Sequence, residues 1–306
     1  SFYGESENFK LGCGIDLMNE IVKFENTNIK GLIFDLRNNA GGNLFEVEYI
    51  SSIFLSKGKY AKLKNKNSKD FLIEEAPTGA CFDLPLLILV DNLTASASEV
   101  LISILKLHNR AIIVGTNTFG KLTGQIILPL LPKKIYLDPN RVGELGYLKV
   151  TNTQIYLNNG ISPQKEGITP DIVLPFLFQE LNSIESTFNN ALPKDTIDSL
   201  GSFYPLKKLP VLQLSKLSKA RIDTSAFFNL ISDLTINYNP KDVKPDTSIS
   251  LLRNFSIQSQ HYNELIEKMD FLNSFESVYS VNNHPYDLET LNSDKQKKEI
   301  DSQIVK

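Results

Sequence analysis

The sequence predicts an α/β fold built around a mainly parallel sheet. Three short apolar runs, each followed by polar or turn-forming residues, indicate buried strands at residues 31–34, 84–90 and 111–114. Helical patterns at residues 47–55 and 99–107 lie between these runs. Strands that alternate with helices at this interval favour parallel pairing, because each helix returns the chain across the sheet.

Further elements are predicted on both sides of this core. Residues 16–25 have an amphipathic helical pattern, and residues 125–131 and 147–156 have strand-like patterns. The stretch 57–69 is dense in lysine and asparagine, so we expect a solvated loop or an edge hairpin there.

A change in composition near residue 176 predicts two regions, a core over residues 1–175 and a helical C-terminal region over residues 176–306. Prolines separate helical patterns in the second region, such as those at 227–234 and 262–271. Residues 293–306 are polar and charged, and we expect them to form a disordered tail.

Composition excludes several functional classes. A chain of 306 residues, 42% hydrophobic, can bury a sizeable core, and its net charge of −3 gives no basic field for nucleic acid. Cys13 and Cys81 are too few for a disulfide framework or a zinc site, although the two could form one disulfide with each other. No apolar run approaches the ~18 residues of a spanning helix. The first residues show no secretory signal.

One serine stands where a predicted strand passes into a predicted helix. Residues 96–99 match the capping box S-x-x-E, with Ser96 as the N-cap and Glu99 reaching back to it. A helix start also offers unpaired N–H groups and the positive end of the helix dipole, which suit a nucleophile. The Ala97 amide could hold its oxyanion. This segment alone favours a cap over a catalytic serine.

Lys121 follows the third predicted strand in a Phe-Gly-Lys turn. A loop lysine is usually solvated, and one that acts as a base must be neutral near pH 7, which requires burial that lowers its pKa. Gln125 could orient the amine without adding a charge. The 3 histidines are dispersed, so a metal site and a Ser-His-Asp triad are both disfavoured. A serine nucleophile would then need another base, and a lysine is one established solution.

Residues 115–121 also fit the phosphate-binding pattern G-x-x-x-x-G-K. That pattern continues with Ser or Thr and then a helix, whereas here Leu122 follows, and residues 123–129 are strand-like. Nucleotide binding is therefore the weaker interpretation, and the sequence indicates neither a cofactor nor a metal.

Four ordered segments resemble those of the C-terminal processing, or tail-specific, serine proteases. They are residues 31–42 with the turn Asn-Asn-Ala-Gly-Gly, residues 94–99, residues 118–121 and residues 160–172. The interval between Ser96 and Lys121 also resembles that of the family, and a looser similarity continues to about residue 255. Four ordered motifs are more specific than any one of them, and they change the interpretation of Ser96 from cap to nucleophile.

The resemblance implies a serine endopeptidase with a Ser-Lys dyad. Ser96 would be the nucleophile, Lys121 the general base and Gln125 its orienting partner, with the Gly41 and Ala97 amides as the oxyanion hole. The family has a crotonase-like (ClpP-like) layered core, and its substrates are polypeptides, often with apolar C-termini. Its members are usually periplasmic, in the cell envelope or in plastids. The oligomeric state stays open.

Two residues depart from the family pattern. Leu122 stands where glycine is usual, and could crowd the base or help to bury it; Ala40 stands where proline or glycine is common. No PDZ-like segment precedes the core, so we expect the chain to begin just after one and to be weak or inactive by itself. The alternative function is a binding protein on the same scaffold, in which the protease site does no work.

Overall fold

The computed structural model describes residues 1–4, 12–24, 27–66, 68–74, 80–130, 146–176 and 185–237, with 267, 284, 285 and 287. Its contacts divide the chain into two compact units. One comprises Ser1–Met18 and Lys30–Pro240, and the other Asn19–Ile29 and Lys241–Lys306. In the second unit, Lys23 forms ion pairs with Glu20 and Asp287.

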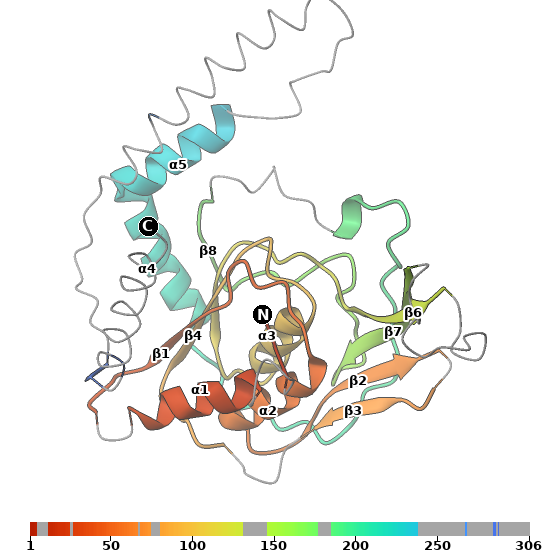
Figure 1. Cartoon of the computed structure of the whole chain (residues 1–306). Helices are drawn as coiled ribbons and strands as arrows, with labels where there is room; N and C mark the ends of the chain where they lie inside the picture. Colours follow the sequence, from red (N-terminus) through yellow and green to blue (C-terminus); the bar gives the residue numbers. More distant parts are fainter. Residues whose placement is uncertain are drawn as a thin grey trace, which may run out of the picture. The chain divides into compact units, whose positions relative to one another are not determined.

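A parallel sheet in the order β1-β4-β5-β8 forms one layer of the first unit (Figure 1). Its strands are β1 (Leu32–Asp35), β4 (Leu86–Val90), β5 (Ile112–Gly115) and β8 (Ile172–Val173). The three strands predicted for this sheet are confirmed, with slightly shifted ends, and β8 is an addition.

A second, antiparallel sheet has the order β3-β2-β7-β6. It contains β2 (Lys59–Asn65), β3 (Phe71–Glu74), β6 (Thr123–Pro129) and β7 (Tyr147–Leu157). The predicted, mainly parallel sheet is therefore only one of the two sheets of this unit. Of the two alternatives predicted for residues 57–69, the solvated loop is wrong and the edge hairpin is confirmed, because β2 pairs with β3 at the edge of this sheet. Within that hairpin β2 is the inner strand, with Tyr60 and Leu63 buried. Lysines between these buried positions conceal the pattern.

Two helices connect strands of the parallel sheet. They are α2 (Leu44–Phe54), between β1 and β4, and α3 (Ala97–Leu107), between β4 and β5. Helix α3 contacts β5 on one side and β2 and β7 on the other, so it lies between the two sheets (Figure 1). Its side chains from Ala97 to Leu105 are buried, which explains its nearly continuous apolar sequence. A further helix, α1 (Cys13–Val22), precedes β1.

The boundary predicted near residue 176 falls inside the first unit. The chain returns to the core after β8, because Ile197 N–H donates to Gly160 O, and Leu209 and Leu214 pack against the cluster that contains Ile172. This part contains η3 (Glu185–Thr187), α4 (Val211–Thr224) and α5 (Ala226–Asn237), and α5 confirms the helix predicted at 227–234. Apart from residue 267, the helix predicted at 262–271 lies outside the described residues, as does the tail 293–306.

Candidate active site

Three loops meet at the carboxyl ends of the parallel strands. They follow β1 (residues 36–43), β4 (residues 91–96) and β5 (residues 116–122). Neighbouring parallel strands end at the same edge of a sheet, and this edge is where ligands of such sheets usually bind. The loops contain three of the five predicted site residues, Gly41, Ser96 and Lys121. Ala97 is the first residue of α3, and Gln125 lies just beyond the third loop on β6.

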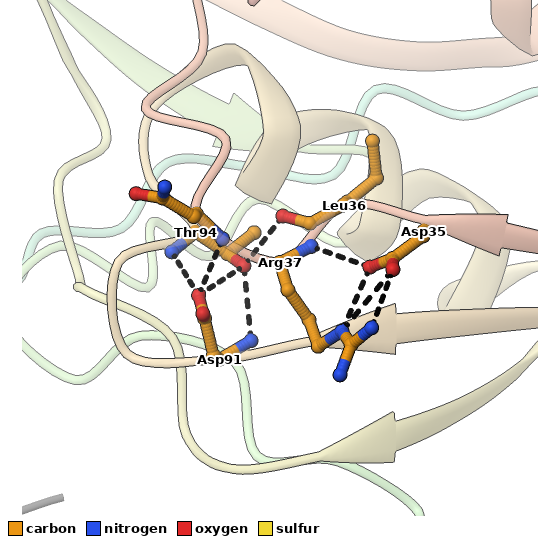
Figure 2. A network of polar contacts seen from close by, with 6 residues as sticks. Asp35, Leu36, Arg37, Asp91 and Thr94 are labelled. Carbon is orange, nitrogen blue, oxygen red and sulfur yellow. Dashed lines mark hydrogen bonds and ion pairs between the residues drawn. The ribbon is translucent and has the colours of Figure 1, made fainter. Parts of the chain in front are cut away.

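A buried aspartate joins the first two loops (Figure 2). Asp91 Oδ1 accepts hydrogen bonds from the N–H groups of Asn38 at 2.9 Å and Thr94 at 3.0 Å. The Thr94 hydroxyl donates in turn to Leu36 O at 2.8 Å. In the same view Arg37 pairs with Asp35 on the surface, at 2.7 Å. The Asp91 and Thr94 contacts hold the turn after β1 against the segment that leads to Ser96.

Ser96 is the N-cap of α3 and has a strained backbone. Its φ of 59° and ψ of −120° lie in a region that a residue with a side chain rarely adopts, at a cost of about 1–3 kcal/mol. The surrounding contacts fix this geometry, since Ser96 N–H donates to Glu99 Oε2 at 2.9 Å and Ala95 N–H donates to Asn39 O at 3.0 Å. A strained turn between strand and helix is typical of a nucleophile elbow, because it projects the hydroxyl away from the helix.

The two predicted oxyanion-hole amides lie next to each other. Gly41 has a φ of 87°, and a Cβ there would lie 2.6 Å from both Ala97 N and Ala95 O, so the turn requires glycine. The Ala97 N–H is one of the first in α3, and it makes no hydrogen bond within the described part of the chain. The Gly41 N–H, in contrast, donates to Asn39 Oδ1 at 3.0 Å.

The buried carboxylate of Glu99 joins the loops of the nucleophile and of the lysine. This side chain is 0% exposed, and besides Ser96 N–H it accepts from Gly120 N–H at 2.7 Å and Lys121 N–H at 2.9 Å. A fourth donor is the Thr118 hydroxyl, at 2.5 Å. Burial raises the pKa of Glu99 above its ordinary value, and these four hydrogen bonds act in the opposite direction.

Lys121 is half-buried in the loop after β5. Burial lowers the pKa of its amine, with Lys149 acting in the same direction and Glu185 and Glu99 opposing it. Its Nζ donates to Thr123 O at 2.9 Å. Among the described residues, no hydrogen bond joins this amine to the Ser96 hydroxyl.

Gln125 lies on the exposed part of β6, and its Nε2 is 3.4 Å from Thr151 Oγ1. The structure therefore does not join Gln125 to Lys121. The segment next to the lysine is held by Gln164, whose Oε1 accepts from Leu122 N–H at 2.7 Å and whose Nε2 donates to Glu185 at 2.9 Å. The Leu122 side chain is itself fully buried, at 0% exposure.

Three residues that shape the site, Asp91, Thr118 and Gln164, were not predicted from the sequence, and Glu99 was predicted only as part of a helix cap. The available signal was weak, because Asp91 and Thr118 are ordinary loop residues. Their partners in the structure, such as Asn38 for Asp91 and Glu99 for Thr118, are distant in sequence. Within the described ranges, no group of three or more His, Cys, Asp or Glu side chains could hold a metal ion. None of their helices is long and apolar enough to cross a membrane.

Comparisons with known proteins identify a family. The profile of Peptidase family S41 matches residues 7–174. A carboxy-terminal-processing protease of Bartonella bacilliformis is 36% identical over 153 residues, which cover 50% of this chain and 32% of that protein. A tail-specific protease of Haemophilus influenzae is 33% identical over 192 residues, covering 62% of this chain and 27% of that protein. The matched part is thus about a third of these relatives' length.

One solved structure that aligns with part of this chain is that of the photosystem II D1 C-terminal processing protease. It aligns with 55% of this chain and 40% of its own chain, at 24% identity and a TM-score of 0.45.

Proposed function

Because the chain belongs to peptidase family S41, we propose that it is the catalytic part of a serine endopeptidase of the tail-specific type. Its nucleophile is Ser96 and its general base is Lys121. The observation that best supports this proposal is the Glu99 carboxylate, which binds the backbone N–H groups of both residues at 2.9 Å and so holds their loops together. We infer that the core is crotonase-like and that the protein acts in the periplasm or cell envelope on polypeptides with apolar C-termini.

The proposed reaction runs through an acyl-enzyme. The Ser96 oxygen attacks the carbonyl carbon of a peptide bond, and its proton passes to the neutral Lys121 amine. The Ala97 and Gly41 amides stabilise the oxyanion, and losing one such donor costs about 3–4 kcal/mol of transition-state stabilisation. The C–N bond breaks as the leaving amine takes the proton from Lys121. Water then hydrolyses the ester, giving a free carboxylate and restoring the Ser96 hydroxyl.

Two contacts must be exchanged before this reaction can occur. The Lys121 amine has to exchange its hydrogen bond to Thr123 O for one to the Ser96 hydroxyl. The Gly41 N–H has to exchange its hydrogen bond to Asn39 Oδ1 for one to the substrate oxygen. We propose that the first contact is exchanged by rotation of the lysine side chain and the second by rotation of the Asn39 carboxamide. Exchange of both contacts is therefore part of the proposal.

Cleavage of an unfolded reporter polypeptide with an apolar C-terminus tests the proposal. Ser96→Ala and Lys121→Ala, each in the whole parent protein, should lower kcat by about a thousandfold or more. Ser103→Ala is a matched control on the same helix and should keep the activity, since among the described residues its hydroxyl bonds only Glu99 O. Undiminished cleavage by Ser96→Ala would refute the proposal. Absence of cleavage and of labelling by a serine-reactive phosphonate in the unsubstituted protein would favour the binding-protein alternative.

The pH dependence gives a second test of the base. Only the neutral amine accepts a proton, so kcat/KM should rise with pH through the pKa of Lys121 and then level off. Since burial lowers this pKa, the midpoint of the rise should lie below about 10.4, the ordinary value for lysine. A midpoint at or above that pH would contradict the role of Lys121.

A further inference from the structure

A cavity of about 890 Å³ lies at the opposite end of the parallel strands from the candidate active site. Leu86 and Ile112, the first residues of β4 and β5, line it, whereas Ser96 and Lys121 follow the last residues of these strands. Cavities of roughly 300–1,000 Å³ commonly bind small molecules. Its location separates it from the proposed peptidase chemistry.

The walls of the cavity are mostly apolar, and its charged groups are mostly cationic. The apolar part includes aromatic and aliphatic side chains from three segments: Phe54, Leu55, Phe82, Leu206, Leu209 and Leu214. Lys57, Arg110 and Lys207 also line the cavity, with Asp83 as the acid. Among the lining residues that the structure describes, the cations thus outnumber the acids, and the local field favours an anion.

Arg110 is a buried cation, and its hydrogen bonds to described residues all go to neutral groups. It is 7% exposed; its Nε donates to Phe54 O at 3.2 Å, and its Nη2 to Phe82 O at 2.7 Å and Leu84 O at 3.0 Å. The guanidinium also lies over the rings of Phe54 and Phe82, at 5.6 and 5.9 Å. Burial lowers the pKa of Arg110, and Asp83 opposes this. Such a cation gains from an anionic partner.

The Nη1 group of Arg110 is the part available to a ligand. It makes no hydrogen bond to any described residue, while the other guanidinium nitrogens are occupied by the three carbonyls. A guanidinium N–H bonds a carboxylate more strongly than it bonds a neutral acceptor. The cavity thus offers a charge-assisted donor beside an apolar surface.

We propose that this cavity binds a single-chain amphipathic carboxylate of the fatty-acid type. Its carboxylate bonds to Arg110, and its apolar chain lies against the leucine and phenylalanine walls. A peptide fits less well, because its amide groups need polar partners. Of the described lining residues, only Ser56, Asn109 and Tyr204 carry uncharged polar side chains, and Asn109 Nδ2 is already bonded to Leu206 O.

Calorimetry with the 306-residue chain tests this proposal, with dodecanoate and dodecanol as probes below the micelle concentration. Dodecanoate should bind at least about tenfold more tightly than dodecanol, since only the carboxylate pairs with the cation. Arg110→Met should remove this difference. Equal affinity of the unsubstituted chain for the two probes would overturn the proposal. So would tighter binding of an apolar tripeptide with a free C-terminus, which would assign the cavity to polypeptide ends.

A second variant is needed, because Arg110→Met also removes contacts of the fold. Ala80 is exposed and lines the cavity, so Ala80→Trp should fill part of it without disturbing the core. We expect Ala80→Trp to weaken dodecanoate binding at least about tenfold, and Ala80→Ser, the matched control, to leave it unchanged. Unchanged binding by Ala80→Trp would show that dodecanoate binds elsewhere.

Discussion

Two buried side chains of opposite charge lie near the two ends of helix α3, Glu99 at its start and Arg110 just after its end. At its start the Glu99 carboxylate accepts from three backbone N–H groups and one hydroxyl, and just after its end the Arg110 guanidinium donates to three carbonyls. Neither ion forms a salt bridge with a described residue. Peptide groups thus stabilise both charges. The N–H groups that bind Glu99 belong to the loops of the candidate active site, whereas the carbonyl groups that bind Arg110 lie beside the cavity.

Glu99→Leu tests the first end and should have the largest effect on stability. The substitution leaves four buried donors without an acceptor, so the free energy of unfolding should fall by about 3–5 kcal/mol. Chemical denaturation of the chain measures this change. Glu99→Gln keeps the size and one acceptor oxygen and should lose less. A loss below about 1 kcal/mol for Glu99→Leu would mean that the four hydrogen bonds do not hold the loops.

Arg110→Met tests the end of α3 next to the cavity. It should lower the free energy of unfolding by about 2–3 kcal/mol, which is less than the loss expected for Glu99→Leu. Buried carbonyls tolerate a missing partner better than buried N–H groups do, and methionine replaces the apolar stem of arginine. The same denaturation experiment applies. A larger loss than that of Glu99→Leu would reverse the ranking of the two ends.

Ser96→Gly tests whether the nucleophile position is strained. Glycine adopts a φ of 59° without a Cβ penalty, so this variant should be more stable than Ser96→Ala by about 1 kcal/mol, although both lose the hydroxyl. Thermal denaturation compares the two. Ser98 is the control, because it lies within α3, and there the glycine variant should be less stable than the alanine variant by about 0.5–1 kcal/mol. The same order at both positions would exclude backbone strain at Ser96.

His108, the C-cap of α3, should give the smallest effect and only in acid. Burial lowers the pKa of its ring, which packs between Tyr60 and Phe203 and has Nδ1 2.8 Å from Ile104 O. Because the folded-state pKa is below the unfolded value of about 6.5, its contribution to stability is complete above that pH and is lost as pH falls through the folded-state pKa. Urea denaturation between pH 7 and 4 should show a shallower decline for His108→Phe. Parallel declines would contradict the prediction.

The sequence by itself determined the local elements and the positions of the motifs. Strands β1, β4 and β5 and helices α2 and α3 follow from apolar periodicity, which depends only on neighbouring residues. The placement of Ser96 at a junction of strand and helix follows from the same patterns. So does the glycine turn at Gly41, whose positive φ requires that residue type.

Only the tertiary structure decided which distant groups share a site. Pairing of β2 with β7 makes an apparently solvated segment an inner strand, and the return of residues 185–200 to the core displaces the predicted boundary. The contacts of Glu99 with Gly120 and Lys121, and of Arg110 with Phe54 and Phe82, join parts of the chain far apart in sequence. Burial and hydrogen bonding of an ion are set by whatever the fold brings beside it, and no local pattern contains that information.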